Sequence, residues 1–127
     1  MLTTSTITHM LPAQDTDRAR HFYGDQLGLR ETETGPDGTR YFEAGSGHVI
    51  GLRPLPDAKP SENTAISFEV SNISSEVNDL EGRGVRFADF DSDDLRTEGH
   101  IATMGNEKAA WFSDSEGNWL CLHEVTR

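Results

Sequence analysis

Short segments in which hydrophobic and polar positions alternate flank a helical repeat in the first half of the chain. The alternation over residues 5–11 predicts a strand, which Pro12 ends. Asp15 is a suitable N-cap for the helix that follows, and Gly28 supplies its stop signal. The apolar side of this helix consists of Ala19, Phe22, Tyr23 and Leu27. Further strands separated by turns that contain glycine are predicted at residues 29–34, 40–44 and 48–52.

The same order of elements is predicted again after a polar segment bounded by prolines. Alternation over residues 64–70 predicts a strand, and Asn72 is a suitable cap for a second helix. The apolar side of that helix is weaker and consists of Ile73, Val77 and Leu80. Residues 91–107 show no periodicity and are expected to form a long loop of the kind that can act as a lid or binding loop. Strands are predicted at residues 85–90, 109–113 and 118–125.

The recurring pattern is a diverged duplication. A shift of 57 positions places Thr8 on Ala65, and a shift of 70 positions places Tyr41 on Trp111 and Gly51 on Cys121. A single four-stranded sheet leaves exposed edges and an uncovered face, so two copies are expected to close around a shared cleft. The predicted fold class is therefore α+β, with two βαβββ modules forming a curled eight-stranded mixed sheet around a central cleft and the helices on its outer face. The predicted organisation is one domain over residues 1–127, with modules at 1–54 and 62–127 and a linker at 55–61.

Composition narrows the classes of partner. The 127 residues suit a single domain, and 11 basic against 22 acidic residues give a net charge of −11. This charge repels phosphate backbones and anionic membrane surfaces, so neither nucleic acid nor membrane is expected as a partner. Cys121 is the only cysteine and no 18-residue apolar run occurs, which favours a cytoplasmic protein.

Two motifs carry a resemblance to a known family. The run DTDRARHFY at residues 15–23, followed by Leu27-Gly28-Leu29, is similar to the first helix of the vicinal oxygen chelate superfamily and its FY…LG ending. The run AWFSDSEGN at residues 110–118 is similar to the closing DPxGN hairpin of that superfamily, with Ser115 where proline is usual. The superfamily includes glyoxalase I, bleomycin-resistance proteins, fosfomycin-resistance enzymes and extradiol dioxygenases. The resemblance covers almost the whole chain, but both motifs indicate a fold and not a chemistry.

The resemblance also implies where a metal would bind. Metal-dependent members take four ligands, usually His and Glu, from the first and last strands of the two modules. The matching positions here are Thr8, Gly51, Ala65 and Cys121. Glycine and alanine have no donor side chain, threonine is a weak ligand, and one thiol does not hold a catalytic metal alone. We therefore predict neither a metal site nor another cofactor. The alternative left open is a non-standard metal site, formed by His9 after a one-residue slip in the register of the first strand that turns it inward, or with a contribution from His100.

Strand periodicity extends the inward-facing positions to a predicted ligand-binding set. That set is Thr8, Met10, Val49, Gly51, Arg53, Ala65, Ser67, Glu69, Trp119, Cys121 and His123. Trp119 suits a planar ligand and Met10 an irregular apolar one, whereas Arg53 and Glu69 either bind charged groups or pair at the rim. His123 is the predicted catalytic acid or base, because imidazole titrates near neutrality. Cys121 is either a nucleophile or an inert buried thiol, and the sequence shows no Ser-His-Asp arrangement.

Three hypotheses about function follow. The first is a protein that binds an organic small molecule in the cleft without a catalytic metal, as the bleomycin-type members do, with a preference for cationic ligands because of the negative charge. The second is a metal-independent lyase, isomerase or hydrolase that uses His123 with Glu69 or Cys121. The third is a metal-dependent lyase or dioxygenase. A homodimer is expected from the resemblance alone.

Overall fold

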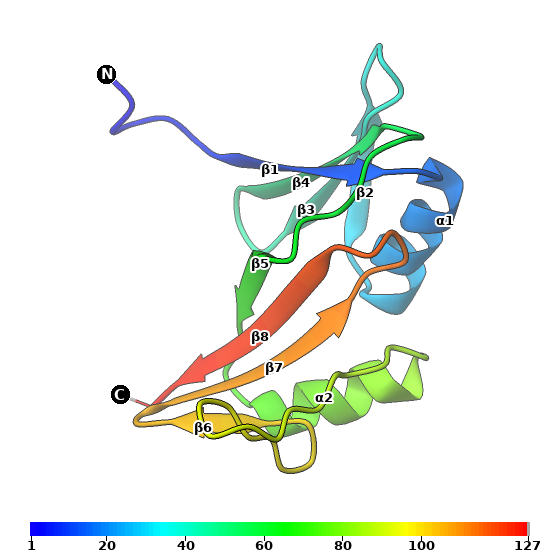
Figure 1. The fold of residues 1–127 in the computed structure, drawn as a ribbon. Coiled ribbons are helices and arrows are strands. Elements are labelled where there is room, and N and C mark those ends of the chain that lie inside the picture. The colour runs from blue at the N-terminus through cyan, green and yellow to red at the C-terminus, as the bar shows by residue number, and fades with distance from the viewer. Residues whose placement is uncertain (127) are drawn as a thin grey trace. The chain divides into compact units, whose positions relative to one another are not determined.

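The computed structural model describes residues 1–126, and the chain divides into two compact units, Met1–Pro60 and Ser61–Arg127. The elements of the first unit are β1 (Thr8–Ala13), α1 (Thr16–Arg20), η1 (His21–Gln26), β2 (Arg30–Thr34), β3 (Arg40–Ala44) and β4 (His48–Pro54). The elements of the second unit are β5 (Thr64–Glu69), α2 (Ile73–Gly82), β6 (Ala102–Met104), β7 (Glu107–Ser113) and β8 (Trp119–Val125). Figure 1 shows the two sets of elements in sequence colours. Each unit therefore follows the predicted order of one strand, a helical segment and three strands.

The two units have the same sheet topology. The strand order is β1-β4-β3-β2 in the first sheet and β5-β8-β7-β6 in the second. In each sheet the first strand pairs in parallel with the last strand of its unit, and the remaining pairs are antiparallel. The α+β class and the two mixed sheets are confirmed, whereas a single curled eight-stranded sheet stays a prediction. None of the helices within residues 1–126 is long and apolar enough to span a membrane.

Strand β1 does not end at Pro12 as predicted. It begins at Thr8 and continues through Pro12 to Ala13, and Pro12 is in register with Arg53 of β4. The prediction was wrong because β1 is an edge strand of its sheet, where a proline nitrogen can face away from the neighbouring strand and no hydrogen bond is lost.

The helical segment of the first unit begins at the predicted cap. The Asp15 carboxylate accepts hydrogen bonds from the backbone N–H groups of Asp17 and Arg18 at 3.1 and 3.0 Å. After Arg20 the helix widens into the π-helix η1, a change that apolar spacing did not predict. Tyr23 of η1 is fully buried and packs against the ring of Phe42 at 6.1 Å between centroids. The side chains buried around this contact are those of Leu11, Ala13, Ala19, Phe22, Ile50 and Leu52.

In the second unit the predicted helix forms but one predicted strand does not. Asn72 caps α2 by accepting from the Ser75 N–H at 3.1 Å, and the buried side chains of α2 lie against β7 and β8. Residues 85–90 form a single bridge, between Phe87 and Phe112, instead of a strand. The alternation of apolar and polar residues in this segment reflects packing, because Phe87 is buried and its ring centroid lies 5.2 Å from that of Phe112. The sheet is completed by β6, within the segment that was expected to be loop.

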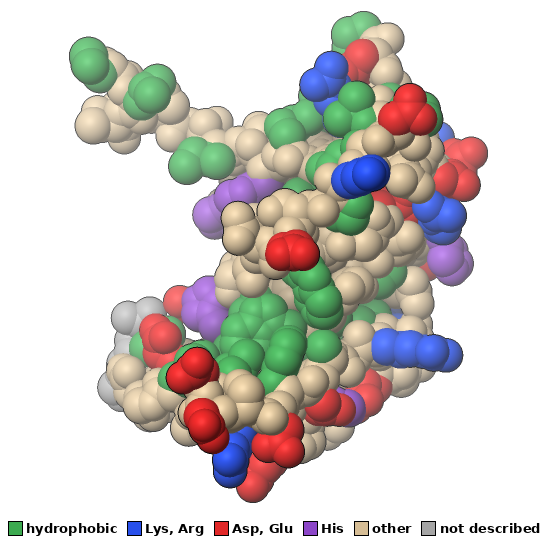
Figure 2. Space-filling model, in the orientation of Figure 1, with side chains coloured by type: hydrophobic (Ala, Val, Ile, Leu, Met, Phe, Trp, Pro, Cys, Tyr) green, Lys and Arg blue, Asp and Glu red, His purple; other side chains and the backbone are tan. Residues whose placement is uncertain are grey.

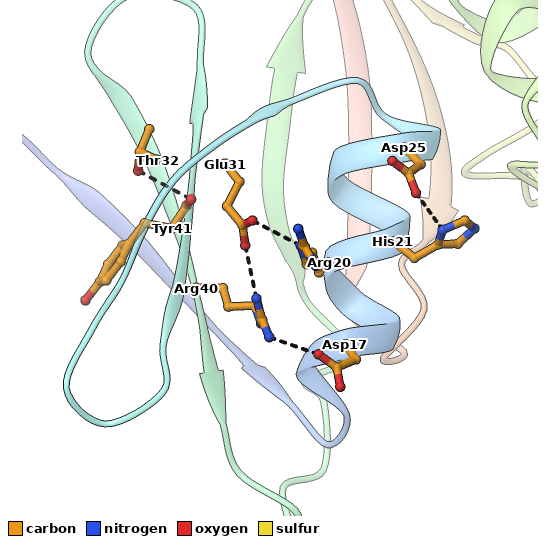
Figure 3. Close-up of polar contacts among 8 residues, drawn as sticks. All are labelled: Asp17, Arg20, His21, Asp25, Glu31, Thr32, Arg40 and Tyr41. Atoms are coloured by element: carbon orange, nitrogen blue, oxygen red, sulfur yellow. Dashed lines mark hydrogen bonds and ion pairs between the residues drawn. The ribbon is translucent and has the colours of Figure 1, made fainter.

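An ion-pair network fastens α1 to β2 and β3 on the outside of the first unit, as Figure 3 shows. The Arg40 guanidinium lies 2.9 Å from Asp17 Oδ1 and 3.3 Å from Glu31 Oε2. Glu31 also accepts from Arg20 Nε at 3.0 Å. A hollow of about 430 Å³ adjoins this network. The residues that line it include Asp17, Arg20, Asp25 and Glu31, and His21 Nδ1 lies 2.7 Å from Asp25 Oδ2.

Removal of the central cation of this network tests its contribution to stability. We expect Arg40→Ala to lower the free energy of unfolding by about 1–2 kcal/mol, because Arg40 is largely shielded from solvent and bonded to two carboxylates. Urea denaturation followed by circular dichroism measures this change. Arg30→Ala is the matched control: Arg30 is 72% exposed and within residues 1–126 pairs only with Glu43, so its loss should cost no more than about 1 kcal/mol. Equal losses in the two variants would contradict the proposed role of the network.

Candidate functional site

In the first unit, the predicted site residues lie on the sheet face opposite the buried core. Thr8 is in register with Val49, Met10 with Gly51, and Pro12 with Arg53. Side chains at paired positions point to the same face, and the alternate positions, which include Ile50 and Leu52, are buried. His9 is in register with Ile50, so it belongs to the core-side face. The register therefore gives no support to the slip that would turn His9 toward Thr8 and Met10.

Gly51 provides space that two neighbouring side chains fill. A Cβ atom at this position would lie 2.7 Å from Met10 Sδ and 3.0 Å from Tyr41 Cε1. Met10 is 49% exposed, so its thioether covers the backbone of Gly51 and remains open to solvent. The sequence did not single out Tyr41, although the duplication aligned it with Trp111. The position that the resemblance assigned to a metal ligand is thus covered by a thioether and a phenol ring.

In the second unit, the corresponding face carries a mixed polar and aromatic surface. Ser67 is in register with Cys121, and Glu69 with His123. Trp111, which the sequence did not single out, also pairs with Cys121 and donates from Nε1 to Thr64 Oγ1 at 3.2 Å. The core-side face of the same strands carries the buried side chains Ala110, Phe112, Leu120 and Leu122.

Two predicted residues lie where the strand pairing is irregular. Ala65 falls within a register shift between Thr64 and Ile66, so strict alternation does not hold at this point. Trp119 is in register with Thr64 and with Ser113, at the other end of the strand from His123. Alternation along β8 still places Trp119 on the face of Cys121.

Ser67, His123 and Glu69 form a connected row across β5 and β8. Ser67 Oγ lies 2.6 Å from His123 Nδ1, and His123 Nε2 lies 3.5 Å from Glu69 Oε1. When Nε2 carries the proton and faces Glu69, Nδ1 is free to accept the hydroxyl proton of Ser67. The histidine side chain is 31% exposed, so a ligand can reach it. The sequence assigned these residues to one face, and their mutual contacts, which depend on the pairing of β5 with β8, could not be read from it.

Cys121 is a buried thiol. It is 5% exposed, and its Sγ lies 3.2 Å from the carbonyl oxygen of Leu122. Burial raises the pKa of the Cys121 thiol, and a hydrogen bond from Ser67 opposes that rise. Because the thiolate is the nucleophilic form, a raised pKa favours the inert reading of Cys121.

The reactivity of this thiol can be measured directly. We expect the native protein at pH 8 to react with iodoacetamide at least about tenfold more slowly than free cysteine, because a raised pKa and burial both lower the amount of accessible thiolate. Protein unfolded in urea is the control and should react at the rate of free cysteine. A rate in the native protein that equals the rate of the unfolded protein would contradict this description.

The described residues do not gather a metal site. Within residues 1–126, no group of three or more His, Cys, Asp or Glu side chains is placed to hold a metal ion. His100 is instead engaged in local contacts: its Nδ1 lies 2.9 Å from Asp89 Oδ1, its Nε2 lies 3.0 Å from Glu81 Oε2, and its ring stacks on Phe87. These contacts join the loop between α2 and β6 to helix α2, which gives His100 a structural role.

The family model of the glyoxalase/bleomycin resistance protein/dioxygenase superfamily matches residues 6–122. The chain belongs to this superfamily. Among solved structures, it is similar to a member of the superfamily from Sphaerobacter thermophilus, with 21% identity, 98% and 99% of the two chains covered, and a TM-score of 0.76. It is also similar to TnmS3, an antibiotic binding protein from Streptomyces sp. CB03234, with 20% identity, 99% of each chain covered and a TM-score of 0.74. None of the curated proteins matches the chain.

A third similar structure is a glyoxalase/dioxygenase from Nostoc punctiforme, with 17% identity, 98% and 92% of the two chains covered, and a TM-score of 0.72. At these identities the likeness concerns the fold, which superfamily members use for different chemistries. The residues of this chain therefore decide its function.

Proposed function

We propose that this superfamily member binds an organic small molecule without a resident metal, through the sheet face that carries Met10, Tyr41 and Gly51. The observation that carries the proposal is the space above Gly51. A side chain there would meet Met10 Sδ at 2.7 Å and Tyr41 Cε1 at 3.0 Å, so this position has exchanged a ligand side chain for apolar contact surface.

The chemistry of this face suits an organic ligand. A methionine has three rotatable bonds and a polarisable sulfur, so it adapts to irregular apolar shapes. Tyrosine adds a flat ring with one polar end, which suits an aromatic or cyclic compound. The net charge of −11 raises the local concentration of cations and favours a ligand with a positive group. The antibiotic-binding role named for TnmS3 is in keeping with this ligand class.

A ligand screen with a matched methionine control tests the proposal. Protein treated with chelator is screened by thermal shift against cationic and neutral organic compounds, and hits are measured by calorimetry. We expect Met10→Ala to weaken binding at least about tenfold, or about 1.4 kcal/mol. Met104→Ala is the control, because Met104 is 45% exposed but belongs to β6 of the other unit. Binding that requires a divalent ion, or that responds equally to the two substitutions, would refute the proposal.

A second function is supported by the Ser67, His123 and Glu69 row. The 2.6 Å contact between Ser67 Oγ and His123 Nδ1 suits proton transfer, and Glu69 can orient the imidazole. A hydrolase would use Ser67 as nucleophile and His123 as base, whereas a lyase or isomerase would use His123 to remove a substrate proton directly. The binding and catalytic proposals rest on different units and can be tested separately.

Turnover distinguishes the two functions. If a bound compound is converted, we expect His123→Ala to lower kcat by about 10²–10⁴-fold, which is the usual contribution of a general base. Ser67→Ala should have a similar effect in a hydrolase and little effect in a lyase or isomerase. His48→Ala, in β4 of the first unit, is the histidine control. Turnover that survives His123→Ala would eliminate the catalytic proposal and leave the binding proposal intact.

The proposal extends to the domain organisation, cellular location and oligomeric state of the protein. We expect one functional domain over both units, a cytoplasmic location and a homodimer. The residues before β1 extend from the first unit as an arm with hydrophobic side chains (Figures 1 and 2), and Met1, Leu2 and Ile7 are 111%, 82% and 69% exposed. Exposed apolar side chains of this kind support contact with a second copy. Light scattering gives the mass: a dimer that becomes monomeric on deletion of residues 1–6 is expected, and a monomeric full chain would contradict it.

A further inference from the structure

The second unit has a hollow of about 370 Å³ on its helical side, away from the row of Ser67, His123 and Glu69. It lies among the first turn of α2, the loop that precedes β6, and strands β6 and β7. Its lining residues are Ser74, Arg96, Glu98, Ile101, Thr103 and Lys108. Two cations, two hydroxyl groups and one carboxylate therefore line this space.

Lys108 is the unusual member of this group. Along β7 it alternates with the buried residues Ala110 and Phe112, so it belongs to the core-side face and is half-buried. Its partner in the strand register is Glu124, but Glu124 Oε1 accepts the backbone N–H of Ile73 at 2.9 Å. Within residues 1–126, Lys108 has no ion pair. A bound anion would supply the counter-charge that this ammonium group lacks.

Arg96 supplies the second cation from the loop. Its guanidinium lies 3.6 Å from Asp91 Oδ1 and 3.8 Å from Asp93 Oδ1, and its Nε lies 3.3 Å from the carbonyl oxygen of Ser92. Both carboxylates are almost fully exposed, so these long pairs are weak and the guanidinium is available to a stronger partner.

The helix terminus is not the source of affinity. The Ile73 N–H already donates to Glu124, and the Ser75 N–H already donates to Asn72. Recognition would come from side chains: the ammonium of Lys108, the guanidinium of Arg96, and the hydroxyl groups of Ser74 and Thr103. All four groups can donate hydrogen bonds, and a compact anion with several oxygen atoms can accept them together.

We propose that this hollow is a second binding site, specific for a small oxyanion group, either a phosphate or a carboxylate borne by a small metabolite. The site is independent of the ligand face in the first unit. The carboxylate of Glu98, which also lines the hollow, opposes a bound anion, so its removal should strengthen binding.

The test uses the full chain with inorganic phosphate in one arm and succinate in the other. Calorimetry and ³¹P NMR titration measure saturable binding. We expect at least one anion to bind, Lys108→Gln and Arg96→Gln each to weaken it about tenfold, and Glu98→Gln to tighten it. Lys59→Gln is the matched control, because Lys59 lies in the other unit, and it should leave binding unchanged.

The outcomes separate the sources of the anion. Binding of phosphate alone assigns a phosphate-bearing ligand, and binding of succinate alone assigns a carboxylate. If neither anion saturates, or if Lys108→Gln and Lys59→Gln weaken binding equally, the proposal is wrong. Circular dichroism of each variant distinguishes loss of the site from loss of the fold.

Discussion

Replacement of Asp114 by alanine is expected to lower the free energy of unfolding by about 3–5 kcal/mol, a large fraction of the stability of a small domain. Asp114 precedes the turn between β7 and β8 and is only 6% exposed. Its Oδ1 accepts the backbone N–H groups of Glu116 and Asn118, each at 2.8 Å, and its Oδ2 accepts Asn118 Nδ2 at 2.9 Å. One carboxylate therefore satisfies three donors in a region from which water is largely excluded.

The size of the effect follows from what the substitution leaves behind. Alanine removes the acceptor but leaves the donors of Glu116 and Asn118 buried, and each buried donor without a partner costs about 1–3 kcal/mol. The same hairpin fixes the register of β8, which carries Cys121 and His123. A loss of order in the turn should therefore also disturb the Ser67 and His123 contact.

Equilibrium urea denaturation measures the change, with an exposed aspartate as control. Asp93 is fully exposed and has only a 3.8 Å contact with Arg96, so Asp93→Ala should change stability by no more than about 0.5 kcal/mol. Asp114→Asn keeps an acceptor oxygen and should give an intermediate loss. If Asp114→Ala costs less than about 1 kcal/mol, the carboxylate is not what holds the turn.

This hairpin shows what a sequence predicts well. The aspartate, glycine and asparagine of residues 114–118 act within one turn, so their spacing is sufficient to locate it. The N-caps Asp15 and Asn72 were found for the same reason, since a cap bonds to N–H groups two or three residues away. Features whose cause and effect lie close together in the chain were therefore predicted correctly.

Features that depend on contacts between distant parts of the chain were not predicted correctly. Strand β6 has three residues, too few for any periodicity, and it forms because Ala102 to Met104 pair with β7. Residues 85–90 alternate as a strand would, yet they meet their sheet at a single bridge. Pattern alone does not distinguish a segment that pairs with a strand from one that only packs against a sheet.

For the candidate site, too, local patterns were predicted and contacts between distant residues were not. Alternation placed Met10 and Gly51 on one face, because it depends only on position within a strand. The 2.6 Å approach of Ser67 to His123 joins residues 56 positions apart, and it depends on the parallel register of β5 and β8. Tyr41 and Trp111 were overlooked although the duplication had already paired them. Tyr41 and Trp111 lie on β3 and β7, directly opposite Gly51 of β4 and Cys121 of β8.

The second large effect is expected at Gly51. We expect Gly51→Ala to destabilise the protein by about 1–3 kcal/mol, because the new methyl group would lie 2.7 Å from Met10 Sδ and 3.0 Å from Tyr41 Cε1. Met10 is half exposed and can move aside, but the Tyr41 ring is attached to the adjacent strand and has less freedom. Displacement of these two side chains should also weaken ligand binding. Thermal denaturation and calorimetry measure the two losses.

A double-mutant cycle assigns the cause. Met10→Ala removes the nearest atoms, so in that background Gly51→Ala should cost at least about 0.5 kcal/mol less than in the parent protein. Gly82→Ala is the matched control: a Cβ atom there meets nothing within 4 Å, and in helix α2 alanine should raise stability by up to about 1 kcal/mol. Additive costs for Met10→Ala and Gly51→Ala would mean that the thioether does not occupy the space of the missing side chain. In that case Gly51 would not mark an apolar ligand surface in place of a metal ligand.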